Sequence, residues 1–259
     1  MRGKLIAVGL LLALAAVMMP LESRIHAQRA ELKFGGSGMT MAMRDRVGQE
    51  MAIGLLAGFR GVVADFLWID NHGYFERREW LRMYRNMELC TTLQPQSVTF
   101  WDVGSWHMGW NIAYASRIDP ANHTQAEGIK REREWQDKAK EFLTQGLVCI
   151  PHRWELYFAM ADLYWRKFKT PCQARDYFQR AAQFKEAPSY CLRMYVRRVE
   201  DCDGPRAAYD VWRKRWHDGN PEPSSDGIDM KNVMRRELHR LEELLDIPAS
   251  QRLISSPHA

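Results

Sequence analysis

Two matching segments decide the fold: TPCQARDYFQRA at residues 170–181 and GPRAAYDVWRKR at residues 204–215. Each has a proline at its second position, and the two prolines are 34 positions apart. A proline is tolerated in the first turn of a helix, because its missing N–H would have no partner there. Ala174, Phe178 and Ala181 then recur at a spacing that places them on one helical face. The segments therefore predict two helices related by a 34-residue repeat.

Each predicted helix has a partner upstream. The second copy places Ala208 where the first has Ala174, and Trp212 where the first has Phe178. Neither helix of such a pair can bury its apolar stripe alone, so we expect stacking between successive pairs to complete the core. The apolar face of the partner helix in the first copy consists of Leu156, Phe158, Ala161 and Trp165, and the second copy has Val199 in the place of Trp165.

This pattern resembles the tetratricopeptide repeat, a helix–turn–helix unit of 34 residues. Trp101 lies where the family has its first-helix tryptophan, whereas Asp162 and Val196 replace the glycine that is usual in the first helix. The resemblance implies an all-α solenoid of about four units, and an irregular all-α bundle is the alternative. Upstream, the family's second helix and its closing proline are matched by Ala139, Leu143, Gly146 and Pro151, and more loosely by Met83, Met87, Cys90 and Pro95.

The N-terminus has the pattern of an export signal. Arg2 and Lys4 precede an apolar run from Leu5 to Met19, which is typical of a signal peptide or signal anchor. No clean small-x-small cleavage site follows, so an uncleaved anchor over residues 1–22 is favoured and a cleaved signal is the alternative. The basic start predicts a cytoplasmic N-terminus. The rest of the chain is then expected in the periplasm, on a single-pass anchor in a bacterial inner membrane.

The remaining boundaries follow from composition. Residues 23–44, with their glycine-rich stretch, are predicted to be a flexible tether. The repeats are expected over residues 45–220, and a capping helix with a tail over residues 221–259. In that last helix the apolar stripe of Met234, Leu238, Leu241 and Leu245 is expected inside, with Glu242 and Glu243 facing water. The polar stretch from Arg117 to Arg133 is interpreted as an insertion in the second unit that forms a surface loop and a helix start.

Met51–Ile69 is apolar apart from its glycines, Arg60 and Asp65. Two charges at mid-membrane make a second membrane span costly, so this run is interpreted as the buried opening helix of the repeats. Both charges are then expected to be partly buried. Within it, Phe59–Trp68 resembles the opening of bacterial membrane-anchored repeat proteins.

The sequence offers no catalytic or cofactor motif. There is no glycine-rich phosphate loop, no Gly-x-Ser-x-Gly and no His-Glu-x-x-His, and the eight histidines are scattered. We therefore expect neither an enzyme nor a bound cofactor or metal. The net charge of +5 comes from 37 basic and 32 acidic residues, a mixed surface that does not indicate nucleic acid.

The five cysteines leave at least one without an intramolecular partner. Cys90 and Cys149 lie on apolar helix faces, where they are expected to act as small hydrophobic residues. The other three are Cys172, Cys191 and Cys202, and the sequence leaves open whether any two of them form a disulfide.

In tetratricopeptide repeats the first helices line a concave groove that holds a peptide or a partner helix. Arg193 and Arg197 are the preferred binding residues, because two arginines four positions apart repel each other unless an anion offsets them. A guanidinium can also donate two parallel hydrogen bonds to a carboxylate. The resemblance implies a groove lined by Trp68, His72, Asp102, Trp106, Arg166, Tyr190, Arg193 and Arg197, with Asp65, Phe75 and Leu163 on the same side.

These patterns together favour a binding protein: a membrane-tethered helical-repeat scaffold that holds a protein or peptide partner in the bacterial cell envelope. The alternative is an enzyme or a small-molecule-binding helical domain. That alternative would use an aromatic pocket around Trp106, to which Trp101 and Trp110 contribute.

Overall fold

The computed structural model describes residues 58–218 and 226–254, which form helices and connecting turns without a strand. The predicted all-α class is therefore confirmed for this part of the chain. The expected anchor and tether lie outside the described residues. Within the described ranges, none of the helices combines the length and the apolar character needed to cross a bilayer. The chain divides into two compact units between Gly104 and Ser105.

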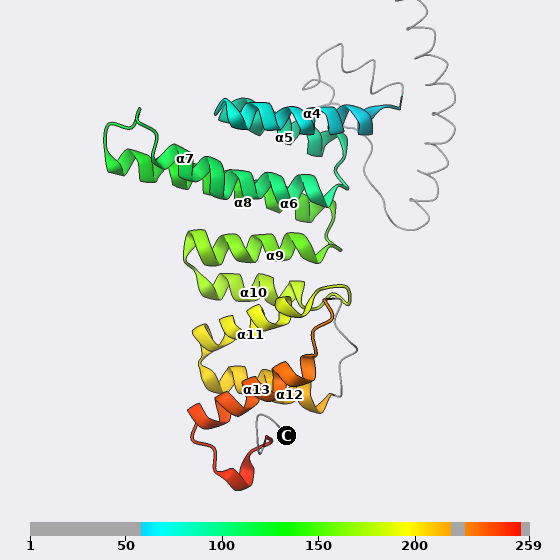
Figure 1. Cartoon of the computed structure of the whole chain (residues 1–259), viewed down its shortest axis with the longest axis vertical. Helices are drawn as coiled ribbons and strands as arrows, with labels where there is room; N and C mark the ends of the chain where they lie inside the picture. Colours follow the sequence, from blue (N-terminus) through cyan, green and yellow to red (C-terminus); the bar gives the residue numbers. More distant parts are fainter. Residues whose placement is uncertain (1–57, 219–225, 255–259) are drawn as a thin grey trace, which may run out of the picture. The chain divides into compact units, whose positions relative to one another are not determined.

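The first unit contains α4 (Arg60–Glu76), α5 (Trp80–Leu93) and most of α6 (Val98–Trp106). Helices α4 and α5 pack side by side as a hairpin (Figure 1). Their interface is closed by hydrogen bonds from the side-chain amide of Asn86 to the Leu67 carbonyl, at 2.8 Å, and from that of Gln94 to the Gly61 carbonyl, at 2.9 Å. One core cluster of this unit contains the buried residues Ala64, Cys90, Leu93 and Phe100.

The start of α4 corrects the interpretation of Met51–Ile69 as one helix. Gly58 has a φ of +79°, in the left-handed region that lies outside a right-handed α-helix. Helix α4 begins only at Arg60. Arg60 is half-buried as expected, but Asp65 is exposed. Asp65 lies away from the side of α4 on which Ala64 and Asn71 are buried, so it needs no buried partner.

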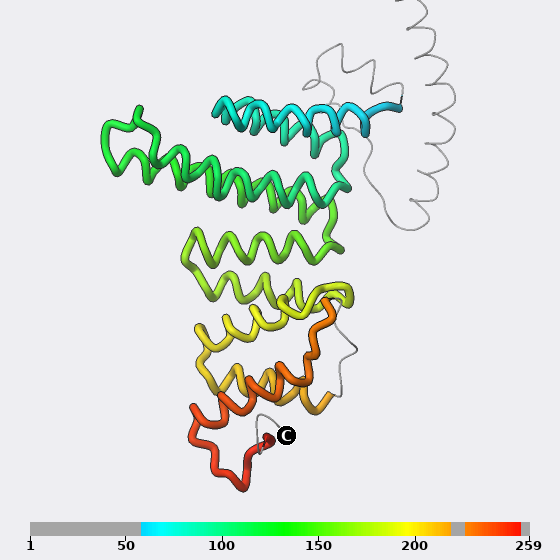
Figure 2. The backbone as a smooth tube through the Cα atoms, in the orientation of Figure 1, coloured from blue at the N-terminus to red at the C-terminus, as the bar shows by residue number. Residues whose placement is uncertain are grey.

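The second unit is a series of layered hairpins (Figures 1 and 2). The end of α6, η1 and α7 form one helical rod that packs on α8; α9 and η2 pack on α10, and α11 packs on α12. Successive layers meet where α8 contacts α9, α10 contacts α11 and α12 contacts α13. The elements are η1 (His107–Ile112), α7 (Ala113–Arg117), α8 (Gln125–Cys149), α9 (Trp154–Leu163), η2 (Tyr164–Phe168), α10 (Pro171–Ala181), α11 (Ser189–Asp203), α12 (Pro205–His217), α13 (Met230–Leu244) and η3 (Ala249–Gln251).

The two matching segments form α10 and α12. Pro171 and Pro205 occupy the first turn of their helices. Phe178 is fully buried, and Trp212, its counterpart 34 positions later, is almost so. The burial expected for both copies is confirmed. The alanines of the pattern, Ala174, Ala181 and Ala208, are also fully buried.

The polar insertion lengthens the second hairpin. Its loop ends at Thr124, whose hydroxyl accepts the N–H of Glu127 at 3.1 Å, while the Glu127 carboxylate accepts the N–H of His123 at 2.9 Å. This reciprocal cap fixes the start of α8. One turn on, a Cβ at Gly128 would lie 2.4 Å from the carbonyl oxygen of Arg117. Only glycine allows the loop to close so tightly on α8.

The last helix, α13, covers the end of the second unit. One of its residues differs from the predicted pattern of burial. Met234, Leu238 and Leu241 are buried as expected. Glu242, expected to face water, is fully buried instead. Its carboxylate accepts hydrogen bonds from the Tyr209 hydroxyl at 3.2 Å and the Leu253 N–H at 2.7 Å. The C-terminal segment after α13 folds back over this position, which a helical pattern alone does not reveal.

Candidate partner-binding surface

The second unit exposes an aromatic and aliphatic ridge along its first helical rod. Trp106, Tyr114 and Ile118 are 47%, 58% and 58% exposed, and we call these three residues the apolar ridge. They recur at multiples of four positions, a spacing that keeps them on one side of a helix. The opposite side of the same rod is tightly packed, since Met108 and Ile112 are fully buried. Three large apolar side chains exposed on one side of a rod make this side a candidate interaction surface.

Two π-helical turns lie beside this ridge, in the first helices of adjacent hairpins. Trp110 on η1 has the Nζ atom of Lys167, on η2, 5.1 Å from its ring centroid. Close approach is possible because Gly109 has no side chain: a Cβ there would lie 3.0 Å from Leu163 Cδ1. The first helices of the two hairpins are therefore neighbours. Single π-helical turns are rare and are found frequently at functional sites.

Cations from η2 and from α8 gather at the second π-helical turn. Burial lowers the pKa of Lys167, an effect that the carboxylate of Glu132 opposes. Phe168 has two cations over its ring, Arg133 at 4.9 Å and Lys140 at 5.1 Å from the centroid. These contacts hold positive groups against aromatic rings, and the one between Lys167 and Trp110 lies on the rod that carries the ridge. The surface could therefore bind apolar groups at the ridge and anionic groups at the neighbouring cations.

The predicted arginines lie further along the same unit. Arg193 and Arg197 are both exposed on α11. A terminal nitrogen of Arg197 lies 3.4 Å from a carboxylate oxygen of Glu200, so this arginine already has an acidic neighbour. Arg166 is exposed on η2, and its Nε donates to the Asp162 carboxylate at 2.6 Å. All three therefore offer cationic groups to the solvent, two of them with an acid beside them.

Two other expected groove residues are involved in packing. Leu163 is fully buried beneath Gly109, so its expected place on the groove is wrong. Tyr190 is half-buried and packs edge-on against Trp154 and Phe158, with ring centroids 6.0 and 5.0 Å apart. The layer above or below a helix decides which of its residues stay accessible, and helical spacing alone does not show this.

The remaining expected residues belong to the first unit. Trp68 is half-buried and packs on Phe100, with ring centroids 4.8 Å apart. His72 is exposed and its Nε2 lies 3.3 Å from the Glu76 carboxylate. Asp102 is half-buried on α6, and Asp65 and Phe75 are exposed. That the residues of the two units form one groove stays a prediction.

Sequence reasoning missed Arg198, which is buried next to the exposed arginines. Its guanidinium carbon lies 4.3 Å from the ring centroid of Trp165, and it pairs with Asp201 at 2.9 Å. Its Nε has no hydrogen-bond partner among the described residues. Burial lowers the pKa of Arg198, and Asp201 opposes that effect. The only sequence signal was an acid three positions after the arginine, a spacing too common to single it out.

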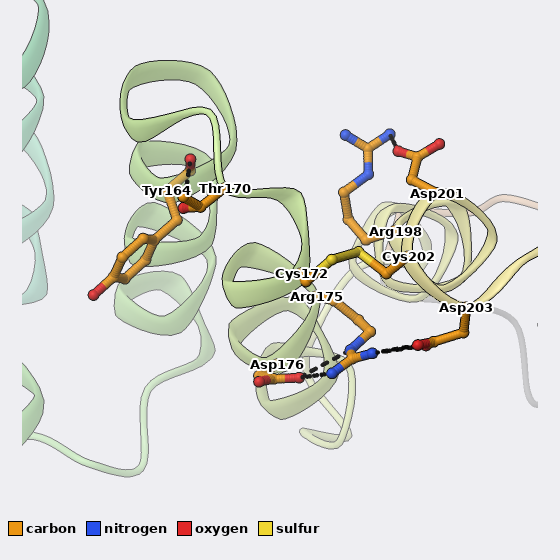
Figure 3. The surroundings of a disulfide bond; sticks show 9 residues. All are labelled: Tyr164, Thr170, Cys172, Arg175, Asp176, Arg198, Asp201, Cys202 and Asp203. Atoms are coloured by element: carbon orange, nitrogen blue, oxygen red, sulfur yellow. Dashed lines mark hydrogen bonds and ion pairs between the residues drawn. A yellow bond between two sulfur atoms is a disulfide. The ribbon is translucent and has the colours of Figure 1, made fainter.

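A disulfide joins Cys172 and Cys202, a pairing that the sequence left open (Figure 3). It connects the first turn of α10 to the last turn of α11, with 5.6 Å between the Cα atoms. Beside it, Arg175 donates to both carboxylate oxygens of Asp203, at 2.9 and 2.7 Å. Cys191 is a buried free thiol whose pKa is raised to about 12 by burial. Two successive layers are thus held by a covalent bond and an ion pair.

The tryptophans that were expected to share a pocket have different surroundings. Trp101 is buried in the first unit, where its indole N–H donates to the Pro95 carbonyl at 2.9 Å. Trp106 is exposed, and Trp110 is half-buried under Lys167. Across residues 58–218 and 226–254 there is no group of three or more His, Cys, Asp or Glu side chains that could hold a metal ion. No protein-family model, curated protein or solved structure gives a significant match to this chain.

Proposed function

We propose that this protein is a helical-repeat scaffold, tethered to a membrane by its N-terminal segment, that binds a protein or peptide partner. The observation that carries the proposal is the apolar ridge of Trp106, Tyr114 and Ile118. A well-packed helical rod leaves these large side chains in solvent. Aromatic side chains of this kind supply most of the binding energy in protein interfaces. Covering them with a partner removes a large apolar area from water.

The chemistry around the ridge favours a partner with both apolar and acidic groups. Lys167 lies against Trp110, next to the ridge, and exposed arginines follow on the first helices of the next two hairpins. Guanidinium groups bind carboxylates with two parallel hydrogen bonds. An amphipathic helix or an extended peptide would place apolar side chains on the ridge and acidic ones towards Arg166 and Arg193. We propose such an acidic, amphipathic segment as the partner.

A tetratricopeptide-like solenoid is the proposed architecture. It is supported by two successive helix pairs with a proline in the first turn of the second helix, and by Phe178 and Trp212, which are buried 34 positions apart. In such an array each pair contacts only its neighbours. The first helices then form a continuous surface, and the contact between Trp110 and Lys167 is one junction of that surface.

The proposed location is the bacterial envelope, with the helical units on the periplasmic side. Disulfides form and persist in oxidising compartments and are rare in the cytosol. The Cys172–Cys202 bond supports an exported domain for that reason. The basic start and the apolar run from Leu5 to Met19 support the same proposal.

The experiment is site-specific photo-crosslinking in intact cells with the full-length chain. A photoreactive amino acid replaces Tyr114 on the ridge or, as a matched control, Val148, which is exposed on α8. We expect Tyr114 to trap a discrete protein and Val148 not to trap it. Substituting Trp106→Ala should abolish the crosslink at Tyr114 while the circular dichroism of the purified chain stays unchanged. If Tyr114 traps nothing beyond what Val148 traps, the ridge is not a partner site.

The arginines are tested separately. Arg193→Glu together with Arg197→Glu should reduce the crosslink at Tyr114, because the acidic part of the partner would be repelled. The matched control reverses the charges of two other arginines with Arg213→Glu and Arg215→Glu. Both are exposed on α12, the second helix of the same hairpin. If both double variants lose the crosslink at Tyr114 equally, the effect is one of general charge, and a specific role of α11 is rejected.

The second candidate function is a small-molecule site around Trp106. His107 favours it: its ring lies edge-on to Trp106, with 5.2 Å between centroids, and burial lowers its pKa, so its imidazole stays neutral near neutral pH. Native mass spectrometry of the full-length chain purified under mild conditions distinguishes the two. A bound small molecule lost on Trp106→Ala, without any protein crosslink at Tyr114, would favour the pocket.

A further inference from the structure

Four cations gather around one aromatic side chain at the end of η2. Phe168 is the last residue of η2, and the charged groups of Arg133 and Lys140 on α8 lie 4.9 and 5.1 Å from its ring centroid. Lys167 and Lys169 flank Phe168 in the sequence. We call these four cations the Phe168 cluster. Two cations that contact the same ring are within about 10 Å of each other, close enough to repel at 0.1 M salt.

Three of the four cations have no acidic partner in the described part of the chain. Lys140 is paired with Asp137, at 3.2 Å. Arg133, Lys167 and Lys169 take part in no ion pair within residues 58–218 and 226–254. Positive charge is therefore in excess at this point of the second unit, and a bound anion would offset the repulsion.

The electrostatics of Lys167 show the same excess. Burial is the largest cause of its lowered pKa, and the neighbouring charge of Lys169 lowers the pKa further. The carboxylate of Glu132 opposes both effects. That carboxylate is already paired with Arg117, at 3.1 Å. The acid that acts on the cluster is thus engaged by a cation outside it.

The backbone holds one member of the cluster in an uncommon conformation. Lys169 follows η2 directly and has a φ of +57°, in the left-handed region. A helix that ends in this conformation usually has glycine there, because a Cβ is disfavoured. The side chain of Lys169 is exposed, so packing does not offset this cost. A ligand that uses its ammonium group would account for a lysine at this position.

A ligand with phosphate groups suits the cluster better than one with carboxylates. A phosphate monoester carries nearly two negative charges at neutral pH and three acceptor oxygens. Arg133 offers a fork of N–H donors, and each lysine offers three more. Arg133 and Lys140 are seven positions apart, which is about 10 Å along the axis of α8. This separation suits two or more phosphate groups better than one.

We propose that the Phe168 cluster binds a ligand that carries two or more phosphate groups. These groups belong to a soluble polyphosphate or to the head groups of neighbouring anionic lipids, which present the same oxygen atoms. None of the four cations belongs to the apolar ridge, and the inference does not depend on the partner proposed for that ridge.

The first test is isothermal titration calorimetry with inorganic tripolyphosphate, on the full-length chain in an uncharged detergent at low salt. Arg133→Gln together with Lys169→Gln should weaken binding about tenfold or more, because two charged donors are lost. The matched control, Arg213→Gln with Lys214→Gln, removes the same charges from exposed positions on α12 and should keep the parent affinity. Citrate, an anion with three carboxylates, should bind much more weakly. No binding of tripolyphosphate, equal loss in both double variants or equal affinity for citrate overturns the proposal.

The second test distinguishes the two sources of phosphate in the full-length chain reconstituted into vesicles. Labelling of Lys169 by an amine-reactive reagent is followed by peptide mass spectrometry, with the exposed Lys214 as the control. Protection of Lys169 in phosphatidylglycerol vesicles but not in phosphatidylcholine vesicles, reversed by Arg133→Gln, identifies lipid head groups. Protection only after tripolyphosphate is added identifies a soluble ligand. Equal labelling of Lys169 under all conditions, or equal protection of Lys214, overturns the proposal.

Discussion

Cys202, in the last turn of α11, is bonded to Cys172, in the first turn of α10 (Figure 3). The bond closes a segment of 30 residues and fastens one helical hairpin to the next. Replacing both cysteines by serine should lower the free energy of unfolding by about 3–4 kcal/mol, because the unfolded chain regains the entropy that the closed loop removes. Urea unfolding of the full-length chain measures the difference.

The matched control for the disulfide is Cys149→Ser, at a half-buried cysteine on α8 that takes no part in the disulfide. It should change the unfolding free energy much less than the double substitution. Reductant should destabilise the parent protein and leave the double-serine variant unaffected. If reductant has the same effect on both, the stabilising role of Cys172–Cys202 is wrong.

Glu242 should be required for the attachment of the C-terminal segment. Its buried carboxylate accepts the Tyr209 hydroxyl and the backbone N–H groups of Leu253 and Ile254. Glu242→Gln replaces one accepting oxygen by an NH₂ group and leaves a buried donor without a partner. We expect a loss of about 1–3 kcal/mol in unfolding free energy, with faster proteolysis after α13. As a control, Glu243→Gln changes the exposed neighbouring residue. It should leave the unfolding free energy and the rate of proteolysis unchanged.

The ion pair between Glu200 and Arg240 should make stability depend on pH in the acid range. Arg240 on α13 donates to both carboxylate oxygens of Glu200 on α11, at 3.0 and 2.7 Å. These hydrogen bonds lower the pKa of Glu200, an effect that partial burial opposes. Because the folded-state pKa lies below the unfolded one, the contribution is complete above the unfolded pKa of about 4.3. It is lost as pH falls through the folded-state value.

Glu200→Gln should therefore flatten the fall in unfolding free energy below about pH 5 and cost about 1 kcal/mol at neutral pH, given the partial exposure of the pair. Denaturant unfolding between pH 3 and 7 checks both effects. Glu141→Gln, an exposed acid on α8, serves as the control and should keep the parent profile. A Glu200→Gln profile parallel to the parent one would contradict the assignment.

The sequence could predict features that depend on neighbours along one helix. Pro171 and Pro205 marked helix starts, and Phe178 and Trp212 marked buried positions, because helical spacing alone decides which residues share a side. These features need no knowledge of what the opposite layer contains.

The features that sequence could not predict depend on contacts between distant segments. Glu242 is buried because residues after α13 return to it, and Arg240 is held by Glu200, 40 positions earlier. Leu163 was expected to line the groove, but its side chain is buried because Gly109 on η1 approaches it closely. A periodic pattern shows that a side is apolar or polar, but the fold decides which segment lies over it.

The last prediction concerns Phe178, the central side chain of the first matching segment. It is fully buried between layers, with its ring edge-on to Phe158 at 5.2 Å between centroids. Phe178→Ala should lower the unfolding free energy by about 3–5 kcal/mol, since the lost contacts leave a cavity. The exposed neighbour change Gln179→Ala should cost little, because alanine is an excellent helix former. Denaturant unfolding compares the two variants, and a cost below about 1 kcal/mol for Phe178→Ala would mean that the layers do not share the core described here.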